Sequence, residues 1–165
     1  MSKDQPPHSC EPSATGVSVL LVIDTAALLA GESEATCCYA LCTGMDSLLT
    51  RNDGQLHLNA LPGEQVRVRW SPTALRGEQA VLLTLQLASD DVLTNLTLQT
   101  NPDATVRVPQ MEDPATLDEQ PAHDAFWQLD VAAEGSVELT LQAIVTDRDA
   151  GVVGTFDWPL SLVVA

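Results

Sequence analysis

Apolar and polar residues alternate with a period of two along most of the chain. Val66, Val68 and Trp70, for example, are separated by single arginines. Neighbouring side chains of an extended strand point to opposite faces, so this alternation predicts strands with one buried face. The alternation, or a short apolar run in its place, recurs in residues 17–23, 36–43, 55–59, 65–71, 80–88, 94–100, 106–108, 125–131, 136–146, 154–158 and 160–164.

Turn signals separate these segments at intervals of about ten residues, a spacing typical of all-β proteins. Asn52-Asp53-Gly54 and Pro62-Gly63-Glu64 are two of them. Only residues 26–30 resemble a brief helix or turn, and no segment keeps a helical period over three turns. This pattern favours a sandwich over alternating strand–helix units. The sequence predicts an all-β, antiparallel β-sandwich, jelly-roll or immunoglobulin-like, with at most one or two short helical turns.

The domain organisation is expected to be simple. Residues 1–16, rich in proline and serine, are expected to form a flexible leader, and residues 17–165 are expected to form a single sandwich domain. Residues 109–124 contain three prolines and five acidic residues without an apolar period, which predicts a long acidic loop at the surface.

Composition and charge narrow the class of protein. Hydrophobic residues make up 45% of the 165 residues, which excludes intrinsic disorder. A formal net charge of −16 would repel nucleic-acid phosphates and anionic membranes, so neither is expected as a partner. The charge either simply keeps the domain dispersed or makes self-association depend on pH, salt or cations.

The start of the chain and the cysteines indicate a cytoplasmic protein. Met1 is followed by polar residues with no apolar stretch of signal-peptide length. Cys37, Cys38 and Cys42 lie in an apolar stretch, while Cys10 lies in the leader. They lack the paired spacing and neighbouring histidines of zinc sites, so we expect small core residues.

Motifs for catalysis and cofactor binding are absent from the sequence. It contains neither Gly-x-Ser-x-Gly nor Gly-x4-Gly-Lys-Ser/Thr. His57 and His123 would have to anchor any hydrolase site, and a structural role is expected for them. Asp147 and Asp149 open an Asp-x-Asp-x-Gly pattern, a weak calcium candidate that lacks the downstream glutamate and equally suits a hairpin turn. No cofactor and no metal are expected.

Several motifs in the same order resemble the bacterial inclusion-body protein family of the PixA/AidA type. The first is a hydrophobic strand that ends in Ile-Asp and runs into Leu-Leu, and the last is an aromatic closing stretch. The resembling segments are Val19-Leu20-Leu21-Val22-Ile23-Asp24-Thr25-Ala26-Ala27-Leu28-Leu29, Gly63-Glu64-Gln65-Val66-Arg67-Val68-Arg69-Trp70-Ser71 with Ala74-Leu75, Phe126-Trp127-Gln128, Gly135, Ile144-Val145-Thr146-Asp147 and Gly154-Thr155-Phe156-Asp157-Trp158-Pro159. The chain departs from the family in a shorter insertion at residues 31–34 and in its scarce tyrosine and methionine.

The resemblance implies a cytoplasmic β-sandwich that accumulates in inclusions, under cell-density control and linked to host association, without established enzymatic activity. The leading hypothesis is therefore a non-enzymatic protein that self-associates as a homo-oligomer, because sandwiches expose edge strands and flat faces that can pair.

The alternative hypothesis is a module that binds a glycan or small ligand through its loops, with or without calcium. The candidate ligand-binding residues are the polar and aromatic members of the resembling motifs: Asp24, Arg69, Trp70, Asp147 and Trp158. Each tryptophan, Trp127 included, lies in an alternating strand, so packing in the core competes with stacking on a sugar.

Overall fold

The computed structural model describes residues 16–33, 36–43, 49–52, 55–74, 78–122 and 124–165, and these contain twelve strands and one α-helix. The elements are β1 (Gly16–Ile23), α1 (Thr25–Leu29), β2 (Cys38–Thr43), β3 (Leu49–Asn52), β4 (Gln55–Leu58), β5 (Gln65–Pro72), β6 (Gln79–Leu87), β7 (Leu93–Asn101), β8 (Thr105–Pro109), β9 (Leu117–Pro121), β10 (Asp124–Val131), β11 (Gly135–Asp147) and β12 (Val152–Val164). The all-β prediction is confirmed. Across these residues no helix has the length and hydrophobicity needed to cross a bilayer. Fifteen of the sixteen residues of the predicted leader lie outside the described ranges, and Gly16 begins β1.

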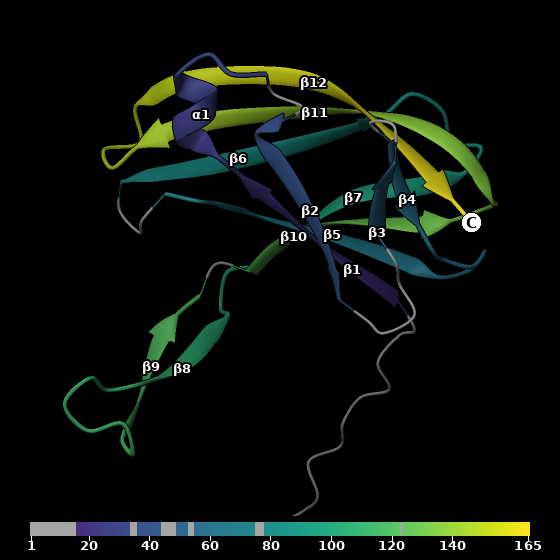
Figure 1. Ribbon diagram of the computed structural model, residues 1–165. Helices are drawn as coiled ribbons and strands as arrows, with labels where there is room; N and C mark the ends of the chain where they lie inside the picture. Colours follow the sequence, from purple (N-terminus) through teal and green to yellow (C-terminus); the bar gives the residue numbers. More distant parts are fainter. Residues whose placement is uncertain (1–15, 34–35, 44–48, 53–54, 75–77, 123) are drawn as a thin grey trace, which may run out of the picture.

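The strands form two five-stranded sheets and a separate two-stranded hairpin. Sheet A has the strand order β2-β1-β5-β10-β7, and sheet B has the order β3-β4-β12-β11-β6. Figure 1 shows the sheets as two layers, with α1 beside β12. The end strands β6 and β7 contact each other across the two sheets, as do β2 and β3 at the opposite ends. The chain crosses between the layers from β2 to β3, from β4 to β5, from β5 to β6, from β6 to β7 and from β10 to β11.

Each sheet contains one parallel pair, so the prediction of an antiparallel sandwich is only partly met. Strand β1 runs parallel to β5 in sheet A, and β4 runs parallel to β12 in sheet B. Parallel neighbours need a long crossover between them. Between β1 and β5 the chain supplies that crossover by passing through β3 and β4 of the other sheet. Alternation within a strand carries no information on the direction of a distant partner, which is why the sequence could not show this.

The core lies between the two sheets. Strand β1 alternates exposed or half-buried residues with buried ones, and β11 does the same over five positions. The buried residues of these two strands are Val17, Val19, Leu21 and Ile23, and Val137, Leu139, Leu141, Ala143 and Val145. Cys37 and Cys38 are buried and Cys42 packs against the core, as predicted, while Cys10 lies outside the described residues.

Strand β12 is a single strand where the sequence predicted two. It runs through Pro159, which pairs with Thr140 of β11. On its other side, β12 pairs with β4 only from Leu162 onward. Proline has no N–H to donate, so it is tolerated where a strand has a partner on one side.

Part of the predicted acidic loop, residues 109–124, is a hairpin. Strands β8 and β9 pair antiparallel from Thr105 with Pro121 to Pro109 with Leu117. Figure 1 shows this hairpin projecting away from both sheets. All five residues of β9 are exposed. With neither face buried, the strand has no apolar alternation, and the sequence pattern could not reveal it.

Candidate functional site

The five predicted ligand-binding residues do not converge on one site. Arg69 and Trp70 are consecutive in β5 and therefore point to opposite faces of sheet A. Asp24 caps the start of α1, where its Oδ1 accepts a hydrogen bond from the Ala27 backbone N–H at 3.0 Å. The carboxylate of Asp24 therefore caps the helix, a structural role for which Asp is one of the preferred residues.

The two carboxylates of the calcium candidate lie in the turn between β11 and β12. Asp147 Oδ1 accepts hydrogen bonds from the backbone N–H groups of Asp149 at 2.9 Å and Gly151 at 2.8 Å. The Asp-x-Asp-x-Gly pattern therefore forms a hairpin turn, which was the alternative to a calcium loop. In the described part of the chain, no three His, Cys, Asp or Glu side chains are grouped to hold a metal ion. His57 is half-buried in β4, and His123 lies outside the described residues.

The three tryptophans belong to the core and its border. Trp158 is 5% exposed. The indole N–H groups of Trp70 and Trp127, both in sheet A, donate to the backbone carbonyls of Val81 and Leu83 at 2.8 Å. Those carbonyls belong to β6, the end strand of sheet B. The two indoles therefore tie the sheets together and satisfy backbone acceptors on an edge strand, which leaves them poorly placed to stack on a sugar.

The closing motif of the sequence also faces the core. Gly154, Phe156 and Trp158 pair with Val145, Ala143 and Leu141 of β11, which are fully buried or nearly so. A Cβ atom added at Gly154 would lie 2.6 Å from the Phe156 ring and 3.1 Å from Leu29. The absence of a side chain at Gly154 lets the ring pack over the backbone.

We expect Gly154→Ala to destabilise the protein by about 1–3 kcal/mol, because the Phe156 ring must leave its packed position. Urea unfolding followed by circular dichroism measures this. Thr155→Ala is the matched control, since Thr155 is exposed on the opposite face of the same strand. Equal stability of the two variants would contradict the packing role of Gly154.

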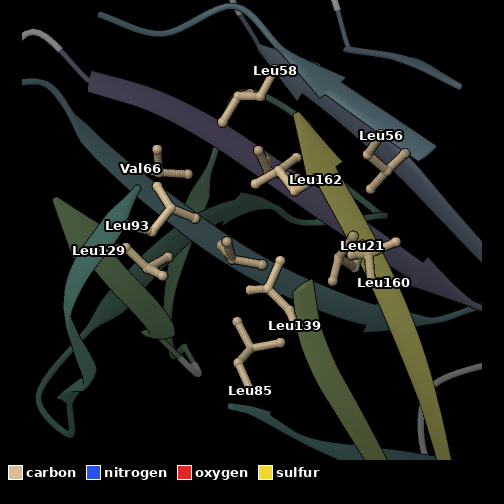
Figure 2. A pocket seen from close by; sticks show the side chains of 12 residues that line it. Leu21, Leu56, Leu58, Val66, Leu85, Leu93, Leu129, Leu139, Leu160 and Leu162 are labelled. Carbon is tan, nitrogen blue, oxygen red and sulfur yellow. The ribbon is translucent and has the colours of Figure 1, made fainter. Parts of the chain in front are cut away.

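A cavity lies between the two sheets, within the described part of the core. It has a volume of about 40 Å³ and is lined by leucine and valine side chains from both sheets, as Figure 2 shows. Ordered water needs two to four polar partners, and drug-sized ligands need pockets of roughly 300–1,000 Å³. The cavity is therefore a dry packing defect between the sheets and offers no ligand chemistry.

The outer face of sheet A carries a cluster of two arginines around an aromatic ring, which the sequence predicts only in part. The guanidinium carbons of Arg69 and Arg67 lie 4.6 Å and 5.6 Å from the centre of the Phe126 ring. Arg69 also forms an ion pair with Asp124, with Nη2 and Oδ1 3.2 Å apart. Cation–π contacts of this kind contribute about 0.5–1 kcal/mol at exposed sites. Alternation put both arginines on one face, but the position of Phe126 depends on the pairing of β5 with β10.

Apolar side chains continue this cluster across the sheet. Leu41 of β2 pairs with Leu20 of β1, and Leu20 pairs with Arg69 of β5, so the three lie in one row across the same face. Tyr39 and Leu41 are 51% and 55% exposed. We call this surface the sheet-A patch; it comprises Leu20, Tyr39, Leu41, Arg67, Arg69 and Phe126. It combines exposed apolar area with two of the seven basic residues of the chain.

Comparison with known proteins identifies the family. The family model described as PixA, inclusion body protein, matches residues 16–164. A crystal structure of the PixA inclusion body protein from Burkholderia cenocepacia J2315 is similar to this chain, with a TM-score of 0.73 and 19% identity over 94% of this chain and 99% of the other. No curated protein sequence matches. The structural likeness shows a shared fold, and the family match extends over nearly all of the described residues. The chain belongs to the PixA family of inclusion body proteins.

Proposed function

We propose that this chain is a non-enzymatic protein of the bacterial cytoplasm that self-associates and accumulates in inclusions. The observation that carries the proposal is the family match over residues 16–164, because the family is described by an assembled state and not by a reaction. Cell-density control and a link to host association are further traits that the resemblance implies, and they form part of the proposal.

Two features of the surface support self-association. The sheet-A patch exposes Tyr39 and Leu41 of β2 on the same face of the sheet as two arginines of β5, with β1 between them, and surfaces of this kind mark protein contacts. In addition, β2 and β7 end sheet A without a further strand partner in the described residues. Unpaired edges can add a strand from another molecule. By contrast, two carbonyls of the edge strand β6 already accept hydrogen bonds from tryptophan.

We expect the molar mass in solution to rise above the 17.6 kDa of one chain as protein concentration increases, and to rise further with salt. Copies with a net charge of −16 repel one another, and salt shortens the range of this repulsion from about 10 Å at ~0.1 M to about 3 Å at ~1 M. Size-exclusion chromatography with light scattering measures the mass. A mass of one chain at every concentration and salt level would contradict the proposal.

The alternative, a glycan-binding or small-ligand module, receives less support from the geometry. Its aromatic candidates Trp70 and Trp158 are half-buried and buried, and its carboxylates Asp24 and Asp147 already accept backbone hydrogen bonds. Of the five candidates, only Arg69 lies on the exposed sheet-A patch. Reproducible binding of the native protein to glycans on an array would support this alternative.

A further inference from the structure

We propose that the tip of the β8–β9 hairpin of one copy docks on the sheet-A patch of the next copy. The inference rests on the proposed self-association and names the two surfaces that make the contact. The partner of the patch is a second copy of this chain, because the tip and the patch are complementary in both polarity and charge.

The patch offers an unneutralised cation beside apolar surface. Arg69 is paired with Asp124, but the contact recorded for Arg67 is the Phe126 ring, and no carboxylate in the described residues lies within ion-pair distance of it. The nearby Asp130 carboxylate accepts hydrogen bonds from Gln65 and Asn95. In a chain of net charge −16, Arg67 is therefore an attractive partner for a carboxylate from outside.

The hairpin tip offers the complementary pair of groups. Met111 is 99% exposed, and Glu112 beside it is exposed as well. A methionine so fully exposed has its entire apolar surface available for burial in a contact, and thioethers pack favourably against aromatic rings such as that of Phe126, which lies beside Arg67. Glu112 supplies the anion for Arg67.

The tip is held in one shape before any contact forms. Asp113 Oδ2 accepts a hydrogen bond from Thr116 Oγ1 at 2.7 Å, and Asp113 Oδ1 accepts one from the Ala115 N–H at 3.2 Å. The Gln110 side-chain amide donates to Asp118 Oδ1 at 2.7 Å, and the Gln110 backbone N–H donates to the Thr116 carbonyl at 2.9 Å. A preorganised tip loses less conformational entropy when it docks.

The contact joins two different surfaces of the same chain. Figure 1 shows the hairpin projecting clear of its own sheets, so its tip is free to reach another molecule. A head-to-tail contact of this kind gives each copy one tip and one patch to use, and it builds rings or open-ended assemblies instead of closed two-fold dimers. Open-ended growth of this kind is one way in which copies accumulate in the inclusions proposed above.

Charge reversal tests the contact at one fixed, moderate salt concentration. Arg67→Glu and Glu112→Arg each place like charges opposite one another, and we expect each to raise the concentration of half-association roughly tenfold or more. An equimolar mixture of the two variants restores an attractive pair at every contact, so its association should return to that of the wild type. The double variant Arg67→Glu/Glu112→Arg should behave like the mixture.

Two matched controls make the same changes of charge elsewhere. Arg148→Glu alters the exposed turn between β11 and β12, and Glu138→Arg alters the exposed outer face of sheet B. Both should associate like the wild type. Circular dichroism and thermal unfolding of each variant check that the fold is intact.

Each other outcome has a distinct meaning. Weakening by Arg67→Glu without weakening by Glu112→Arg would overturn the proposal in favour of a patch-to-patch contact. Weakening by Glu138→Arg would overturn it in favour of the outer face of sheet B as the partner surface. Association unchanged in all variants would overturn it while leaving self-association intact, whereas a monomeric wild type would refute the proposed function itself.

Discussion

Trp158→Ala is expected to lower the free energy of unfolding by about 3–5 kcal/mol. The side chain is 5% exposed in β12 and lies opposite the fully buried Leu141 of β11, so truncation leaves a void between the sheets that neighbours can only partly fill. Since native domains have a total stability of about 5–15 kcal/mol, such a loss approaches global unfolding. Urea denaturation followed by tryptophan fluorescence and circular dichroism measures it.

Trp158→Phe is the matched control, because it keeps an aromatic ring at the same position and should cost less. The outcome also bears on the glycan-binding alternative. A Trp158→Ala variant that remains as stable as the wild type but loses binding to a glycan would contradict the structural role of this residue. Loss of stability, in turn, means that a loss of binding in this variant could not be assigned to a lost ligand contact.

Leu129→Ala should destabilise the protein by a similar amount, about 3–5 kcal/mol. Leu129 is 1% exposed in β10 and already lines the inter-sheet cavity of about 40 Å³, so the substitution enlarges a void that exists in the native core. In cores of this type the cost grows by about 24 cal/mol for each Å³ of remaining cavity. Denaturant unfolding again provides the measurement.

Leu82→Ala controls for the removal of a leucine as such. Leu82 is 49% exposed on β6, and its truncation should change stability by no more than about 0.5 kcal/mol. Equal losses in Leu82→Ala and Leu129→Ala would contradict the burial pattern described for sheets A and B. An unchanged slope of unfolding free energy against denaturant would show that the unfolded state is unaffected.

The residues through which the chain resembles its family are mostly structural. Asp24 caps α1, Trp70 bonds to a carbonyl of β6, and Gly154 makes room for the Phe156 ring. These roles belong to the fold, and the structure does not bring the residues together at one place. The surfaces proposed for self-association draw on both groups of residues: Arg67, Arg69 and Phe126 of the sheet-A patch belong to the motifs, whereas the exposed Tyr39 and Met111 do not.

Local patterning was sufficient to predict most strands and their buried faces. The alternation around Val66 and Val68 placed these residues in the core and the arginines outside, and the structure confirms that assignment. Turn chemistry likewise gives the correct ends of β11, because Gly135 and the Asp147 turn act through nearest neighbours in the sequence. These features depend on interactions between residues a few positions apart, and such interactions can be inferred from a single sequence.

Long-range packing alone established the remaining features. The parallel pairing of β1 with β5, the bonds from Trp70 and Trp127 to β6, and the stacking of Arg67 on Phe126 join residues whose relative positions depend on the whole topology. Strand β9 escaped prediction for another reason: both of its faces are exposed, and burial is what creates the alternation by which a strand is recognised. The candidate contact surfaces arise from this second group of features, because a patch or a projecting hairpin exists only after the sheets have assembled.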